Sequence, residues 1–141
     1  MSYTMPIELG KVREFARALK TRHPAHKGDH PVITPTMLTL ARNAWEPARE
    51  SGYAKLGFDM RRILHAEEEY VFHGALSRAG QLLTCETRLG ETYSKPGKRG
   101  GALRFGVLVT EFRDQDGTLV AEQISTVVET EKAPKKEGTG A

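Results

Sequence analysis

Cysteine and tryptophan are scarce in this sequence, with one of each among 141 residues, and long apolar runs are missing. A lone cysteine, Cys85, excludes an internal disulfide and a cysteine-based metal cluster. No segment approaches the ~20 consecutive apolar residues of a membrane-spanning helix, and the first residues lack the apolar stretch of a signal peptide. These absences predict a cytoplasmic protein that does not insert into a membrane.

A strong excess of one charge is also missing. Lys and Arg number 21 against 18 Asp and Glu, and this net charge of +3 is too balanced to indicate a nucleic-acid partner. With 38% hydrophobic and 28% charged residues, the composition is that of a globular chain long enough for one core. We expect a single domain over residues 1–130 and a disordered tail over 131–141, which has no hydrophobic periodicity.

The first half of the chain carries two helical patterns. From Pro6 to Leu19, apolar residues recur at helical spacing and predict an amphipathic helix, followed by a polar, proline-containing loop over 20–31. Thr34 and Pro35 are typical of a helix start, and the apolar residues after them surround most of the helix. We therefore expect this second helix to be buried, with Trp45 in the core. Residues 48–61 give no firm pattern.

From residue 63 onward the pattern changes to strands. Four long segments, separated by glycine-rich or charged turns, cover residues 63–73, 82–92, 102–112 and 119–129. Apolar and polar residues alternate in the third segment, and Asp116-Gly117 is typical of a tight hairpin turn. Consecutive long strands predict an antiparallel meander. Together with the two helices they indicate an α+β domain whose sheet curls around the apolar helix.

Four strings, in their order and spacing, resemble the MaoC-like hot-dog family; they occupy residues 10–18, 33–37, 62–67 and 70–73. The resemblance is to the N-terminal dehydratase-like branch, which includes non-catalytic subunits of (3R)-hydroxyacyl-carrier-protein dehydratases. It spans roughly residues 6–130. It implies a hot-dog fold, in which a long antiparallel sheet wraps around a buried apolar helix.

Catalytic members of that family carry a loop of the form Asp-x-Asn-Pro-x-His. Its aspartate and histidine act as general acid and base on an acyl thioester, without metal or redox cofactor. The matching string here runs from Thr21 to His26, with Pro24 and His26 conforming but Thr21 at the aspartate position. A threonine hydroxyl does not replace an ionised carboxylate as a proton acceptor near pH 7. The resemblance thus predicts an incomplete catalytic pair, with His26 as the remaining candidate.

Other chemistry remains open at this stage. Asp29 or Asp59 could supply the missing carboxylate from another position. Three histidines lie close in sequence, at positions 23, 26 and 30, but a proline-containing loop lacks the rigid spacing of a zinc site, so we expect no metal. His65 and His73 flank the run Glu67–Glu69, a pattern more typical of the polar face of an edge strand than of a second acid–base pair.

Two groups of residues are candidates for substrate binding. In the family, a backbone N–H at the start of the hot-dog helix holds the thioester oxygen, and the acyl tunnel runs beside that helix. This implies a role for Thr34, Thr36, Met37 and Trp45. The second group is a basic cluster that could meet coenzyme A phosphates or an acidic carrier protein, or could be a solvated hairpin; it consists of Lys95, Lys98 and Arg99.

The sequence and the resemblance together predict a subunit of a (3R)-hydroxyacyl-thioester dehydratase or enoyl-thioester hydratase. This subunit would form part of the wall of the substrate pocket. It would act together with a second hot-dog chain, in a hetero- or homodimer. Its substrate would be an acyl-coenzyme A or acyl-carrier-protein thioester. Two alternatives stay open: a self-sufficient homo-oligomeric hydratase or thioesterase, and a non-enzymatic module that binds acyl thioesters.

Overall fold

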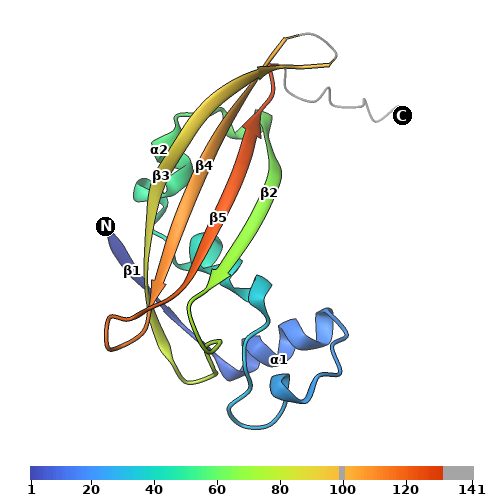
Figure 1. Ribbon diagram of the computed structural model, residues 1–141, viewed down its shortest axis with the longest axis vertical. Helices are drawn as coiled ribbons and strands as arrows, with labels where there is room; N and C mark the ends of the chain where they lie inside the picture. Colours follow the sequence, from blue (N-terminus) through green and yellow to red (C-terminus); the bar gives the residue numbers. More distant parts are fainter. Residues whose placement is uncertain (99–100, 132–141) are drawn as a thin grey trace, which may run out of the picture.

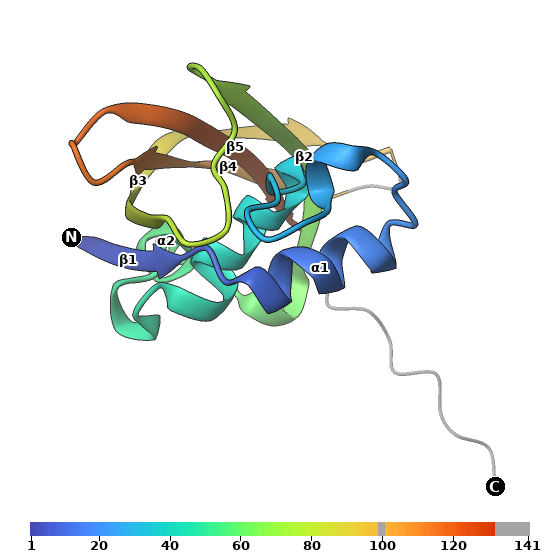
Figure 2. The same cartoon turned by 90° about the horizontal axis from the view of Figure 1, so that it is seen from below.

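A long antiparallel sheet of five strands dominates the computed structural model, which describes residues 1–98 and 101–131. The strands are β1 (Ser2–Pro6), β2 (Ile63–Phe72), β3 (Leu82–Pro96), β4 (Ala102–Arg113) and β5 (Leu119–Glu129). Figure 1 shows the twisted sheet, and Figure 2 shows that it arches over the helical segments on one face. The predicted α+β hot-dog fold is confirmed.

The order of strands differs from a simple meander. Strands β3, β4 and β5 follow one another as predicted, but the full order is β1-β3-β4-β5-β2, so β2 pairs with β5 rather than with β3. The connection after β2 is hydrogen-bonded to the segment before the central helix, through Ser77 to Ile33 and through Ala79 to Pro31. Between β2 and β3 the chain thus crosses under the sheet from the β2 edge to the other side, where β3 lies between β1 and β4.

The N-terminal strand was not predicted. Residues 2–6 pair with β3, with Tyr3 opposite Cys85 and Met5 opposite Leu83, and α1 (Leu9–Ala18) begins after Pro6 rather than at it. Tyr3 and Met5 are buried and their neighbours are exposed or half-buried, which is the alternation of a strand. Five residues are too few for this alternation to stand out in the sequence.

The central helix is irregular. A 3₁₀ turn (Pro35–Thr39) is followed by a π turn (Ala41–Trp45), which closes with the Glu46 N–H donating to the Ala41 carbonyl at 2.9 Å. Its buried residues are Met37, Leu38, Ala41 and Arg42. The prediction that Trp45 lies in the core is wrong, because the tighter and then wider turns rotate it outward and leave it 39% exposed.

Two apolar clusters fill the space under the sheet. The larger joins β1, α1 and the central helix to the sheet, and Phe112 and Met5 are the largest of its fully buried strand residues. The smaller packs α2 (Gly52–Leu56) and Phe58 against β4 and β5. Gly106 makes this second contact possible, since a Cβ there would lie 2.3 Å from Leu56 Cδ2.

The remaining segments are short. Three further 3₁₀ turns occupy Pro24–His26, Ala48–Glu50 and Met60–Arg62, and no helix in the described residues has the length and hydropathy needed to cross a bilayer. Of the tail expected to be disordered, residues 132–141 lie outside the described residues.

Candidate functional site

The end of α1 fixes the position of Thr21. Lys20 adopts a left-handed conformation with φ of 54°, and the N–H groups of Lys20 and Thr21 donate to the carbonyls of Arg17 and Ala16 at 3.0 and 3.1 Å. This pair of bonds is the Schellman arrangement, which turns the chain sharply away from the helix axis. Thr21 therefore begins the loop immediately beside the last turn of α1.

His26 is held in one orientation by the chain that follows it. Its Nδ1 lies 2.8 Å from the Val32 carbonyl oxygen. Since a carbonyl only accepts, Nδ1 carries the proton, and Nε2 of the neutral ring is left as a base. His23, three residues earlier, instead accepts at Nδ1 from the Ala25 N–H at 3.2 Å and caps the short turn.

Thr21 and His26 line the same groove, as the family's catalytic loop implies. The groove has a volume of about 480 Å³ and is also lined by Arg13, Ala16, Arg17, Lys20, Lys27 and Gly28. None of the described residues that line it is a carboxylate. The four basic side chains favour an anionic ligand, but His26 has no acidic partner for proton transfer there.

Neither aspartate proposed as a replacement reaches His26. The Asp29 carboxylate is 93% exposed and lies 3.7 Å from Arg13. Asp59 lies at the start of another turn, where hydrogen bonds from Arg61 lower the pKa of its carboxyl to about 2. Among the described residues, no group of three side chains is placed to hold a metal ion, and the rings of His23 and His26 are 5.8 Å apart.

The two lysines of the basic cluster lie at the far end of the sheet from this groove. Lys95 and Lys98 line a pocket of about 940 Å³ at the β3–β4 hairpin. Figure 1 shows that this end of the β3–β4 pair lies opposite α1. The floor of the pocket is apolar and includes Leu64 and Phe105. The Lys95 ammonium lies 5.4 Å from the centre of the Phe105 ring, a cation–π contact. Arg99 lies outside the described residues.

The other predicted substrate-binding residues divide between core and surface. Met37 is packed in the core and Thr34 is buried with a hydroxyl that finds no hydrogen-bond partner within the described residues. Thr36 and Trp45 are exposed. The structure therefore brings Thr21 and His26 together but separates them from the lysines of the hairpin tip.

Comparison with known proteins shows the family to which this chain belongs. Residues 2–123 match the family described as the FAS1-like, dehydratase domain region. The chain belongs to this family. It is similar to a MaoC-like dehydratase from Rhodospirillum rubrum, with a TM-score of 0.63 and 16% identity over 95% of this chain and 93% of that one. Its family is thus the MaoC-like hot-dog family.

The chain is similar to further proteins over most of its length. A UPF0336 protein from Saccharopolyspora erythraea is 28% identical, over 93% of this chain and 85% of that protein. The HadBC (3R-hydroxyacyl-ACP dehydratase) complex of Mycobacterium tuberculosis has a chain with a TM-score of 0.68 and 22% identity, covering 91% of this chain and 94% of that one. The ChsH1–ChsH2 complex of the same organism has a chain with a TM-score of 0.73 and 14% identity, covering 96% and 86%.

A polar cluster around the buried Arg42, between the central helix and the sheet, was not predicted. Arg42 lies 3.7 Å from Glu68, and the Gln123 amide donates to the same Glu68 oxygen. His65 contacts the other oxygen at 2.7 Å. The Arg42 side chain is 3% exposed, and its Nε and Nη1 have no hydrogen-bond partner within the described residues. A single cation within an apolar helical run was the sequence signal for this cluster.

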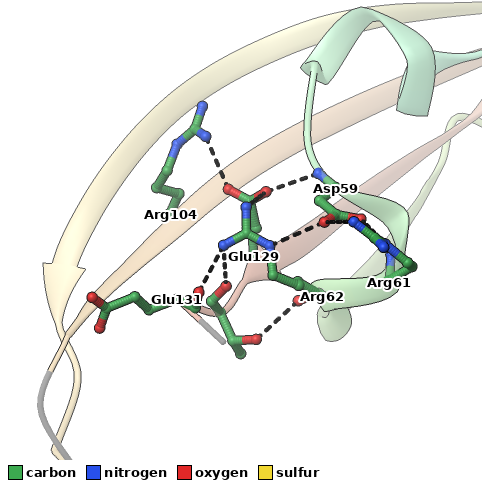
Figure 3. Close-up of polar contacts among 7 residues, drawn as sticks. Asp59, Arg61, Arg62, Arg104, Glu129 and Glu131 are labelled. Atoms are coloured by element: carbon green, nitrogen blue, oxygen red, sulfur yellow. Dashed lines mark hydrogen bonds and ion pairs between the residues drawn. The ribbon is translucent and has the colours of Figure 1, made fainter. Parts of the chain in front are cut away.

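A second unpredicted cluster lies beside the hairpin-tip pocket. The Glu129 carboxylate is 3% exposed and accepts from Arg62 at 2.7 Å, from Arg104 at 2.9 Å and from the Asp59 N–H at 2.8 Å (Figure 3). Arg62 also donates to the carbonyls of Thr130 and Glu131. These contacts fix the end of β5 to β4 and to the turn before β2, so they shape one wall of the pocket.

Proposed function

We propose that this chain is the substrate-pocket subunit of a (3R)-hydroxyacyl-thioester dehydratase or enoyl-thioester hydratase. The dehydration would be catalysed by a second hot-dog chain that carries both the aspartate and the histidine of the loop. The observation that carries this proposal is the groove around His26. It retains a positioned histidine and a basic lining, but Thr21 stands where the aspartate is needed, and the described lining contains no carboxylate.

The edges of the sheet support a partner of the same fold. Strand β2 offers an open edge of ten residues, and the other edge strand, β1, has five. Two sheets joined along β2 would continue as one, which removes an exposed edge from each. A joint along the longer strand gives more backbone hydrogen bonds.

Such a joint also accounts for the distance between the two groups of candidate residues. An antiparallel pairing of β2 strands turns the second chain end for end. The hairpin tip of this chain, with Lys95 and Lys98, would then lie beside the loop that follows α1 in the partner. We propose that this tip contacts the phosphates of the thioester carrier while the partner performs the acid–base chemistry.

The test is hydration of a trans-2-enoyl-coenzyme A, followed as loss of enoyl absorbance. We expect no turnover from the purified chain alone, and turnover when it is co-purified with a hot-dog chain that carries the complete Asp/His pair. In the complex, His26→Ala is expected to retain activity within a few-fold of wild type. The matched control is His23→Ala, in the same loop.

Turnover by the chain alone that is lost in His26→Ala and kept in His23→Ala would refute the proposal and would indicate a self-sufficient hydratase. Absence of turnover with such a partner, while an acyl-coenzyme A still raises the melting temperature, would instead support the binding module.

A further inference from the structure

Strand β2 carries three consecutive glutamates at the centre of its open edge, and the structure separates their roles. We propose that Glu67 and Glu69 prevent β2 from pairing with a second copy of this chain and select a hot-dog partner with Lys or Arg at the facing positions. The inference rests on the proposed function in one respect, namely that the partner is a hot-dog chain joined along β2.

Glu68 differs from its two neighbours. It lies opposite Ser125 of β5 and faces the buried side of the sheet, where Gln123, Arg42 and His65 contact its carboxylate. Its negative charge is therefore compensated within this chain.

Glu67 and Glu69 face the other side of the sheet, because successive residues of a strand alternate. Both are exposed, and they lie opposite Thr126 and Ile124 of β5. Neither has an ion pair with any described residue, so both charges are free to act on a neighbouring strand.

The rows of facing residues across the sheet bring no base close to either carboxylate. Glu67 faces Thr126, which faces Val107. The row that contains Glu69 continues through Ile124 and Val109 before it reaches Arg88 on β3. Three strand spacings of ~4.8 Å place that base roughly 14 Å away, beyond the ~8 Å Debye length at physiological ionic strength. At the start of β2, Arg61 is paired with Asp59, and Arg62 is paired with Asp59 and Glu129.

Two-fold symmetry makes this arrangement unfavourable for a homodimer. In a symmetric antiparallel pair, facing residues lie at equal distances on either side of the central residue. A register centred on Glu67 places two copies of Glu67 opposite each other, and one centred on Glu68 places Glu67 opposite Glu69. Both registers are centred near the middle of β2, and like charges directly opposite each other destabilise a strand pair. A partner with basic residues at these positions removes the repulsion and adds attraction.

Sedimentation of the full chain measures the effect directly. We expect the wild-type chain to be monomeric at micromolar concentration, and Glu67→Gln/Glu69→Gln to homodimerise with a Kd at least about ten-fold lower than that of wild type. The matched control is Glu8→Gln/Glu91→Gln, which makes the same change in net charge at exposed positions outside β2. Amide hydrogen exchange should show new protection of β2 in the dimer.

A charge reversal provides the second arm. Glu67→Lys/Glu69→Lys should form a heterodimer with the wild-type chain, since registers centred on 67, 68 or 69 then place opposite charges together. The heterodimer should weaken as salt is raised.

Two results would overturn the inference: a wild-type homodimer joined at β2 whose Kd is unchanged by the glutamine substitutions, or a failure of both the neutral and the mixed-charge pairs to associate. The enoyl-coenzyme A assay tests catalytic incompleteness separately, so the two proposals can fail independently.

Discussion

Replacing Glu129 is the most direct test of how the hairpin-tip end is held together. Its carboxylate accepts three hydrogen bonds, from the Arg62 and Arg104 guanidinium groups and from the peptide N–H of Asp59, while being almost wholly buried. In Glu129→Ala all three donors lose this acceptor. Arg62 keeps the carbonyls of Thr130 and Glu131, and Arg104 is half exposed and can turn to water.

These residual contacts set the size of the effect. Breaking a buried ion pair by removing one partner costs about 3–5 kcal/mol, and the solvent access of both arginines places Glu129→Ala at the lower end, near ~3 kcal/mol. Glu129→Gln keeps one carbonyl oxygen as an acceptor and loses the charge, so we expect about 1–2 kcal/mol. For a domain of this size ~3 kcal/mol corresponds to a melting temperature lower by roughly 6–12 °C.

Urea unfolding followed by circular dichroism, with calorimetry for the melting temperature, measures both variants against Glu111→Ala. Glu111 has one ion pair, to Arg113, in which both side chains are partly exposed, so this control should cost within about 1 kcal/mol. The reasoning is refuted if Glu129→Ala lies within about 1 kcal/mol of wild type, or if Glu129→Gln is as damaging as Glu129→Ala.

Two further predictions concern the end of α1 and the core. Lys20→Gly should stabilise the fold by about 0.5–1 kcal/mol, because φ is 54° there, whereas Lys27→Gly, at φ of −120°, should not; destabilisation by Lys20→Gly in chemical unfolding would contradict this. Cys85 is fully buried and burial raises the pKa of its thiol to about 12, so its labelling by a thiol reagent at pH 8 should occur only through unfolding and accelerate with urea. Rapid labelling of the native protein would contradict that expectation.

Strands could be located from the sequence because their signal is local. Alternation predicted a strand over 102–112, where β4 lies, and turn residues delimited the segment 119–129, where β5 lies. The Asp116-Gly117 turn between them is present, with Gly117 at φ of 81°. The loop around Thr21 and His26 could also be located from the sequence, because the string from Thr21 to His26 resembles the catalytic loop of the family. The structure places both residues in one groove.

Only the tertiary structure decided what depends on contacts between distant residues. The position of β2 beside β5, the strand at residues 2–6 and the burial of Glu129 and Arg42 all depend on partners far away in the chain. From a short stretch of sequence, a charged residue is predicted to be exposed to solvent. Its burial depends on an oppositely charged arginine or glutamate, and that partner lies on another element of the fold. For the same reason the sequence offered His26 and the hairpin-tip lysines as candidates without fixing their relative positions, and only the structure places them at opposite ends of the sheet. Spacing along the chain determines which side chains share a face, but strand order determines which faces meet.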